Sequence, residues 1–386
     1  MNLATCGILL AGLSLTSALS PASTQALGNP TPAGVERIRK DQWHLNYLDV
    51  AQAQGINKGE GVIVAVPDTG VAPHPDLREN LLTGTDIAAA SSGDGQQDEN
   101  SHGTGMAGII AAHGQSGEIG ALGIAPRASI LPIRTNQTDQ DGDSDRLALG
   151  IEYAVTRGAA VISISSVAGP STRLQRAIEV AIQANVVVVA GAGNKPRDNF
   201  VRFPAAYPGV IAVGGVDRGG NHASFSATGP EIDVVAPAVD IYSTSIDGKY
   251  RKGTGTSDAT AIVAGAAALI RSKYPYLPAR EVAHRLTATA VDKGPPGRDD
   301  EYGYGVIDLV AALTADVPPI GFESVSAPAG AGPSTTAAGR RPGDDGSGAT
   351  ARGLATLGVI VAAGVAWAVV ARHRRRSDDP PPRISR

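Results

Sequence analysis

The chain has 386 residues, of which 42 % are hydrophobic and 18 % charged, and its formal net charge at pH 7 is −4. This length admits one large domain with appended segments. The weakly acidic balance excludes the general basic field of a nucleic-acid-binding protein. Cys6 is the only cysteine and precedes the first long apolar stretch, so the folded domain has no internal disulfide.

The N-terminus has the pattern of an export signal. Residues 7–19 form an apolar stretch of signal-peptide length, and small residues follow it up to a cleavage site after Ala26. The sequence therefore predicts a signal peptide over residues 1–26. Residues 27–60 form an N-terminal extension that is too short for a separate folded pro-domain.

From residue 61 to about residue 314, short apolar runs alternate with longer helical patterns. Continuous apolar runs rich in β-branched residues predict buried strands of a parallel sheet, and they occupy residues 62–66, 160–165, 186–190 and 210–214. Helical patterns occupy residues 103–113, 146–157, 172–184, 257–274 and 278–290. This alternation predicts one α/β domain over residues 61–314, with three αβα layers and a mostly parallel central sheet.

Asp68 stands at the end of the first predicted strand, in the sequence Val-Pro-Asp-Thr-Gly. A carboxylate at the carboxyl end of a strand faces the crevice where α/β sheets place their active sites. Two alternatives stay open for Asp68 taken alone. A turn aspartate is ordinary in this composition. An aspartic protease would need a second carboxylate motif, and the chain has no second Asp-Thr-Gly or Asp-Ser-Gly.

His102 lies in Ser-His-Gly-Thr-Gly, at the start of the first predicted helix. Glycines allow such a helix to begin close to the sheet and to a substrate. A single histidine is more often a packing or surface residue. His44, His113, His222 and His284 lack comparable surroundings and are interpreted as structural, and His74, in the loop after Asp68, as part of the structure of that loop.

Ser257 lies in Gly-Thr-Ser, directly before a long apolar helix. Serine at this place is commonly only a helix cap, but the helix N-terminus also offers partial positive charge and free N–H groups. Asn194 follows another predicted strand in Gly-Ala-Gly-Asn, where asparagine is normally a turn former. With the backbone N–H of Ser257, its side chain would form an oxyanion hole.

The C-terminal part of the chain predicts a membrane anchor. Residues 315–352 are rich in Pro, Gly, Ala, Ser and Thr, which is typical of a flexible linker. Residues 353–371 then form 19 positions without a charge, long enough as a helix to cross roughly 28 Å of bilayer. The basic tail at residues 372–386 predicts a cytoplasmic C-terminus and an extracytoplasmic domain before the span.

Residues 40–314 resemble the subtilase family of serine proteases. Asp68, His102 and Ser257 occur in the subtilisin order of a triad, not in the order of chymotrypsin or the α/β-hydrolases. The resemblance is carried by these motifs: Asp68-Thr-Gly, His74-Pro-Asp-Leu, Ser101-His-Gly-Thr, Gly191-Ala-Gly-Asn194, Gly255-Thr-Ser257 and Gly303-Tyr-Gly-Val-Ile-Asp308. The overall plan is similar to that of the mycosins, membrane-anchored subtilases associated with type VII secretion in actinobacteria.

The chain departs from the family pattern beside the serine. Subtilases usually continue Gly-Thr-Ser with Met or Phe, and a proline stands three residues after that hydrophobic position. This chain has Asp258 and Ala261 at those places. An aspartate suits the first turn of a helix, but a carboxylate next to an oxyanion hole is expected to oppose the developing charge.

The resemblance also assigns a substrate-binding pocket. Ser165, Ser166 and Val167 stand where the family often has Ser-Leu-Gly, a strand that lines the first specificity pocket. Ala192 and Gly193 belong to the same predicted pocket. Val167 is expected to narrow this pocket against bulky substrate side chains.

Together these features predict a membrane-anchored, extracytoplasmic serine endopeptidase that needs no cofactor. Its expected partners are a protein or peptide substrate, the membrane and a type VII secretion membrane complex, without nucleic acid. The alternative is a structural, largely non-proteolytic component of such a complex. The acidic loop with Asp94, Asp98 and Glu99 could bind a structural Ca²⁺, but a solvated loop is the simpler interpretation.

Overall fold

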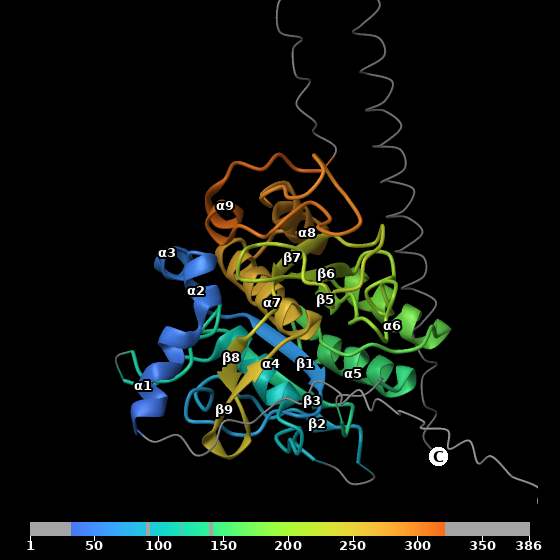
Figure 1. Cartoon of the computed structure of the whole chain (residues 1–386). Coiled ribbons are helices and arrows are strands. Elements are labelled where there is room, and N and C mark those ends of the chain that lie inside the picture. The colour runs from blue at the N-terminus through green and yellow to red at the C-terminus, as the bar shows by residue number, and fades with distance from the viewer. Residues whose placement is uncertain (1–31, 90–92, 117, 139–141, 321–386) are drawn as a thin grey trace, which may run out of the picture. The chain divides into compact units, whose positions relative to one another are not determined.

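The computed structural model describes residues 32–89, 93–116, 118–138 and 142–320 (Figure 1). The predicted signal peptide, membrane span and basic tail, and nearly all of the linker, lie outside these ranges. Within them, no helix has both the length and the apolar character needed to cross a bilayer.

A sheet of seven parallel strands forms the centre of the molecule, in the order β2-β3-β1-β4-β5-β6-β7. Its strands are β1 (Ile63–Asp68), β2 (Thr85–Asp86), β3 (Ser129–Arg134), β4 (Val161–Ile164), β5 (Val187–Gly191), β6 (Ile211–Val216) and β7 (Val234–Pro237). The inner strands are buried along almost their whole length. Burial on both faces explains why they are continuous apolar runs in the sequence rather than alternating patterns.

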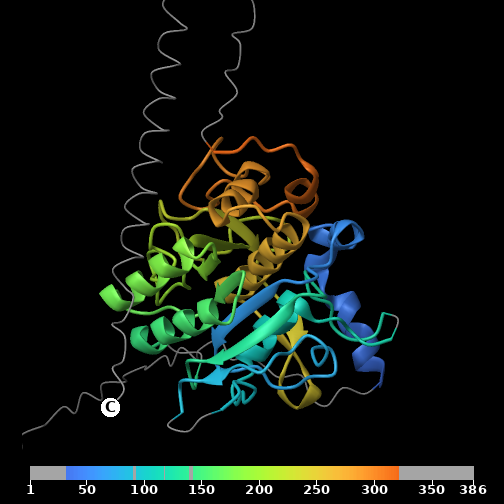
Figure 2. The same ribbon diagram turned by 180° about the vertical axis from the view of Figure 1, so that it is seen from behind.

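Helices cover both faces of this sheet. On one face lie α4 (His102–Ala111) and α7 (Thr256–Lys273), which also pack against each other. The other face is covered by α5 (Ser144–Thr156) and α6 (Thr172–Gln183), the green helices of Figure 2. The predicted three-layer α/β architecture is therefore confirmed. The predicted helices and strands end within one or two residues of the observed ones. Strands β2, β3 and β7 of the sheet were not predicted.

A small antiparallel hairpin was not predicted. It consists of β8 (Ile241–Thr244) and β9 (Tyr250–Gly253), joined through a turn of 3₁₀-helix at Ile246–Gly248. Its strands are only four residues long, and β9 carries two basic residues, so no apolar run marks it in the sequence. The hairpin packs on α4 through β8.

The described part of the N-terminal extension is helical and folds onto the domain. It forms α1 (Pro32–Asp41), α2 (Trp43–Tyr47) and α3 (Val50–Ile56). The last two helices of the described chain are α8 (Ala279–Ala288) and α9 (Leu309–Thr314). The amide of Gln42 donates to the backbone oxygens of Leu122 and Tyr242 at 3.0 and 3.1 Å. The extension is thus attached beside β8.

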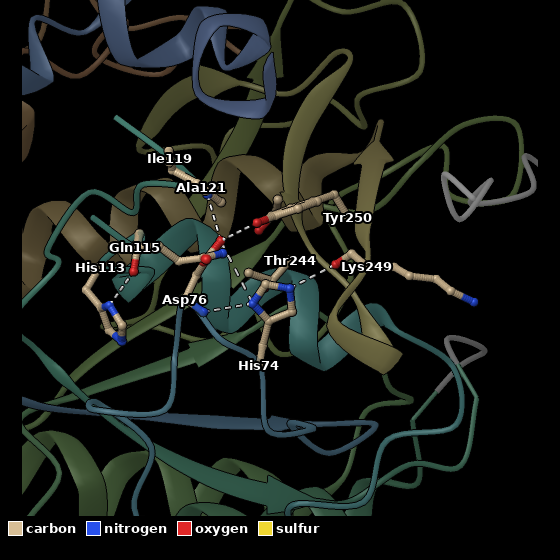
Figure 3. A network of polar contacts seen from close by, with 12 residues as sticks. His74, Asp76, His113, Gln115, Ile119, Ala121, Thr244, Lys249 and Tyr250 are labelled. Carbon is tan, nitrogen blue, oxygen red and sulfur yellow. Dashed lines mark hydrogen bonds and ion pairs between the residues drawn. The ribbon is translucent and has the colours of Figure 1, made fainter. Parts of the chain in front are cut away.

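The His-Pro-Asp-Leu loop is held by a buried polar network (Figure 3). His74 Nδ1 accepts the N–H of Asp76 at 3.0 Å, and Nε2 donates to the carbonyl oxygen of Lys249 at 3.0 Å. Asp76 Oδ2 accepts the Ala121 N–H at 2.7 Å and the Tyr250 hydroxyl at 2.9 Å. These bonds join the loop to the β8–β9 hairpin, which confirms the structural interpretation of His74.

Candidate active site

The site lies at the carboxyl end of β1, in the middle of the sheet. β1 is hydrogen-bonded to β3 on one side and to β4 on the other, so the order of the strands reverses here. Ligands of open α/β sheets bind at the carboxyl ends of the strands next to such a reversal. Asp68 is the last residue of β1, and β4 and β5 end beside it.

Asp68 and His102 are joined by a hydrogen bond. Nδ1 of His102 is 2.8 Å from Oδ1 of Asp68, and the side chains are 10 % and 1 % exposed. Because a carboxylate only accepts, the proton sits on Nδ1 and Nε2 is left as the acceptor. Burial disfavours the imidazolium most strongly, but the charge and hydrogen bond of Asp68 outweigh it, so the pKa of His102 lies above its ordinary value.

The first turn of α4 is fixed by a second buried carboxylate. Asp98 Oδ1 accepts the N–H of Ser101 at 3.0 Å and the hydroxyl of Thr69 at 2.9 Å, while Oδ2 accepts the N–H of Thr104 at 3.0 Å. These bonds satisfy helix N–H groups that have no partner within the helix. They also hold Ser101 in the left-handed region, with φ of 77°. Asp98 therefore orients His102, the residue that follows Ser101.

Ser257 is the second residue of α7, and Gly255 occupies the cap position. Ser257 is therefore not the cap residue of this helix, which was the alternative interpretation of its position. Its hydroxyl donates to the carbonyl oxygen of Ser165 at 3.0 Å, and its backbone N–H, in the first turn, has no intrahelical partner. The helix directs this positive end toward the carboxyl ends of β4 and β5, against which α7 packs.

Asn194 lies three residues beyond the end of β5, next to the start of α7. Its Oδ1 accepts the N–H of Thr256 at 3.0 Å, and its own N–H donates to Oδ2 of Asp198 at 2.9 Å. Since Oδ1 is bound to Thr256, the amide nitrogen Nδ2 is presented as a donor. The structure thus brings Asn194 beside Ser257.

The predicted pocket residues lie on two neighbouring segments. Ser165, Ser166 and Val167 follow β4, and Ala192 and Gly193 follow β5, its parallel neighbour. The hydroxyl of Ser165 donates to the Ser257 carbonyl oxygen at 3.2 Å. The side chain of Val167 is largely buried.

The acidic loop does not have the geometry of a calcium site. Both oxygens of Asp98 are used by the bonds at the start of α4. Asp94 Oδ1 accepts the N–H of Gln96 at 3.0 Å, and Glu99 is an exposed side chain. Among the described residues, no three acidic, histidine or cysteine side chains converge as metal ligands.

Two further residues near His102, Thr69 and Arg251, were not indicated by the sequence. Thr69 Oγ accepts the N–H of Gly103 at 3.0 Å, and Arg251 and Asp258 act on His102 through their charges. Asp98 had a signal, an aspartate shortly before a glycine-rich helix, which is typical of a cap. Arg251 had none, because it comes from the unpredicted hairpin.

Comparison with known proteins identifies the family. A model described as the subtilase family, peptidase S8, matches residues 59–305. The chain belongs to the subtilase family. It is thus a subtilisin-like serine peptidase, as the sequence predicted.

Subtilase relatives cover most of the chain. Subtilisin DY of Bacillus licheniformis is 40 % identical over 287 residues, which are 73 % of this chain and 98 % of that protein. Among solved subtilase structures, MycP1 from Mycobacterium smegmatis is 30 % identical with a TM-score of 0.66, covering 77 % of this chain and 89 % of its own. MycP3 of the type VII (ESX-3) secretion system is 32 % identical with a TM-score of 0.63, covering 76 % and 92 %. The predicted likeness to mycosins is confirmed.

Proposed function

We propose that this subtilase is a membrane-anchored, extracytoplasmic endopeptidase in which Asp68, His102 and Ser257 form the catalytic triad. The observation that carries the proposal is the bond between His102 Nδ1 and Asp68 Oδ1 at 2.8 Å, which leaves Nε2 as the proton acceptor. A serine at the positive end of α7 supplies the nucleophile at the same edge of the sheet.

In the first half of the reaction, the hydroxyl of Ser257 turns from the Ser165 carbonyl toward Nε2 of His102. Nε2 takes the hydroxyl proton as Oγ bonds to the peptide carbonyl carbon. The imidazolium forms beside the Asp68 carboxylate, which stabilises it. Nε2 then gives the proton to the leaving amine, the C–N bond breaks, and an acyl-enzyme on Ser257 remains.

In the second half, water takes the place of the amine. His102 accepts a proton from the water, whose oxygen bonds to the acyl carbon, and returns it to Oγ of Ser257 as the ester bond breaks. During both halves, Nδ2 of Asn194 and the N–H of Ser257 donate to the tetrahedral oxyanion. No cofactor enters these steps.

The triad is tested with a fluorophosphonate probe, which bonds covalently to an activated serine. The detergent-solubilised full chain is compared with Ser257→Ala and His102→Ala. Labelling of the parent chain that disappears in both variants supports the proposal. Labelling that survives Ser257→Ala, or a folded parent chain that does not react, contradicts it.

The placement in a secretion system is proposed from the solved mycosin structures and from residues 353–371. In cells that export a type VII substrate, Ser257→Ala separates peptidase action from a scaffold role. If cells that carry Ser257→Ala no longer export the substrate, secretion depends on catalysis. Export that survives this substitution, but not deletion of the whole chain, supports the structural component instead.

A further inference from the structure

Two opposite charges are buried behind the proposed triad. Arg251 is the second residue of β9, and Asp258 directly follows Ser257 in α7. Each residue is only 2 % exposed. Burying a charge is costly unless an opposite charge or hydrogen bonds compensate it. Neither residue belongs to the proposed triad or oxyanion hole, so their burial needs its own explanation.

Gly253 brings the two charges together. A Cβ atom at this position would lie 2.4 Å from Oδ1 of Asp258 and 2.9 Å from Nη2 of Arg251. Both charged groups therefore lie against the same point of the β9 backbone, in space that any other residue would fill. The Asp258 carboxylate thus lies beside Arg251, a placement that the sequence alone did not indicate.

Gly105 brings Arg251 onto the helix that carries His102. A Cβ atom on Gly105 would lie 2.4 Å from Nη1 and 2.6 Å from Cδ of Arg251. The guanidinium group consequently rests on the first turn of α4. The Gly-Thr-Gly sequence after His102 is explained in part by this close approach.

The hairpin holds Arg251 in this position. Ser243 of β8 lies opposite Arg251 of β9, and its hydroxyl donates to the carbonyl oxygen of Gly105 at 2.7 Å. Thr244 donates in the same way to the carbonyl oxygen of Thr104 at 2.7 Å. On the other side of β9, the neighbouring Tyr250 is bound to Asp76 (Figure 3). The guanidinium is therefore fixed relative to His102.

The charges of Arg251 and Asp258 are not fully compensated by hydrogen bonds to neighbouring groups. Nε and Nη1 of Arg251 and Oδ1 of Asp258 are buried and have no hydrogen-bond partner in the described part of the chain. In a low-dielectric interior such charges act on their neighbours more strongly than in water. Both charges act electrostatically on the imidazole of His102.

Three charged groups act on His102, and they come from three elements: Asp68 of β1, Arg251 of β9 and Asp258 of α7. The other strands packed on α4 contribute Arg134, which is paired with Asp86 at 3.1 Å, and the half-buried Tyr242. The carboxylate of Asp98 caps α4, the basic residues of α7 lie in its last turn, and α4 has no other titratable residue.

We propose that Arg251 and Asp258 are positioning residues, a compensating charge pair that sets how readily His102 takes the proton of Ser257. This inference rests on the proposed triad. The charges of two carboxylates acting on one imidazole would hold the imidazolium too firmly for a base, and the charge of Arg251 offsets the second of them. Asp258 raises the pKa of His102 and Arg251 lowers it. Burial in turn raises the pKa of Asp258 itself, against Arg251 and His102.

The two single substitutions have opposite expected effects. In Asp258→Asn, Arg251 acts on His102 without its counterpart, so the imidazole loses its proton at lower pH. In Arg251→Met, the second carboxylate acts uncompensated, so the imidazole keeps its proton to higher pH. A merely structural role would lower activity in both variants without moving the pH dependence in opposite directions.

The test uses the full chain and the second-order rate of fluorophosphonate labelling as a function of pH, which reports the free base. The rising limb is expected to move down by about one pH unit in Asp258→Asn and up by about one unit in Arg251→Met. The double variant returns close to the parent limb. Asp233→Asn, a half-buried carboxylate outside the site, serves as the control and leaves the limb in place.

Limbs that stay at the parent position in both single variants, or move in the same direction, overturn the charge pair. If Arg251→Met fails to fold, Arg251→Lys takes its place, because it keeps the positive charge. The rising limb of Arg251→Lys is expected to lie at the same pH as that of the parent chain. A limb of Arg251→Lys at higher pH also overturns the proposal. Failure of the triad is recognised separately, because the parent chain would then label without needing His102 and Ser257.

Discussion

Ser165 and Ser257 hold each other through two hydrogen bonds that run in opposite directions. The hydroxyl of Ser257 donates to the backbone carbonyl oxygen of Ser165 at 3.0 Å. In return, the hydroxyl of Ser165 donates to the backbone carbonyl oxygen of Ser257 at 3.2 Å. These bonds fasten the start of α7 to the end of β4. They place the proposed nucleophile at the edge of the predicted specificity pocket.

Removing one of these bonds tests the fastening. Ser165→Ala keeps the backbone acceptor for Ser257 but loses the return bond, so the free energy of unfolding is expected to fall by about 1 kcal/mol. Urea unfolding measures the loss. Ser166→Ala is the matched control, because the Ser166 hydroxyl is buried without a hydrogen-bond partner among the described residues. Equal losses in both variants would contradict the role of the bond.

The proposed oxyanion donor is tested with Asn194→Ala. Loss of one such donor typically lowers kcat by about 10²–10³-fold, a range that itself comes from a subtilisin. The same reduction is expected for hydrolysis of a chromogenic peptide by the full chain. Because the N–H of Thr256 also loses its acceptor, the thermal unfolding of the variant is recorded as a control for the fold. A folded variant with nearly unchanged kcat would exclude this assignment.

Val167 is expected to restrict the first specificity pocket. In a series Val167→Ala and Val167→Gly, each loss of side-chain volume should increase kcat/KM for substrates with a P1 aromatic residue, with about tenfold gained at glycine. A P1 alanine substrate is the internal reference, since its side chain needs no additional room. A parent enzyme that already cleaves aromatic P1 substrates best would sink this expectation.

The network around Asp76 is expected to stabilise the hairpin that carries Arg251 (Figure 3). Tyr250→Phe removes the hydroxyl that donates to the Asp76 carboxylate at 2.9 Å. A hydrogen bond to a charged group contributes about 1.5–3 kcal/mol, so Tm is expected to fall clearly. Tyr242→Phe, in the paired strand β8, is the matched control, because no hydrogen bond of its hydroxyl is found among the described residues. The prediction fails when the two variants have the same Tm.

The buried imidazole of His44 is expected to make the protein less stable in acid. Burial lowers the pKa of His44 from 6.5 to about 3 in the folded protein. Its stabilising contribution is complete above the unfolded pKa and is lost as pH falls from 6.5 toward 3, by up to about 1.4 kcal/mol per pH unit.

The measurement for His44 is urea unfolding at about pH 7.5 and about pH 5, a window on both sides of its unfolded pKa. His44→Leu removes the titrating group, so its free energy of unfolding should fall by roughly 2 kcal/mol less than that of the parent chain across this window. Identical losses in the two proteins would show that His44 does not titrate on unfolding.

The sequence by itself determined the three-layer architecture and marked the proposed site residues. Strands β4 and β5 are apolar runs because they are buried on both faces, and this pattern is visible in the local sequence. Asp68, His102, Asn194 and Ser257 stand where strands end or helices begin, and local sequence marks such places. The parallel sheet then brings them to one edge.

Only the tertiary structure decided the surroundings of His102. Arg251 reaches the first turn of α4 because a hairpin without an apolar signature is bonded to that turn, and because Gly105 and Gly253 leave room for it. Asp98 is a possible calcium ligand in the sequence, but in the structure it caps α4 through hydrogen bonds from Thr69 and Thr104. Such contacts join segments far apart in the chain, and their geometry depends on packing that no local pattern encodes.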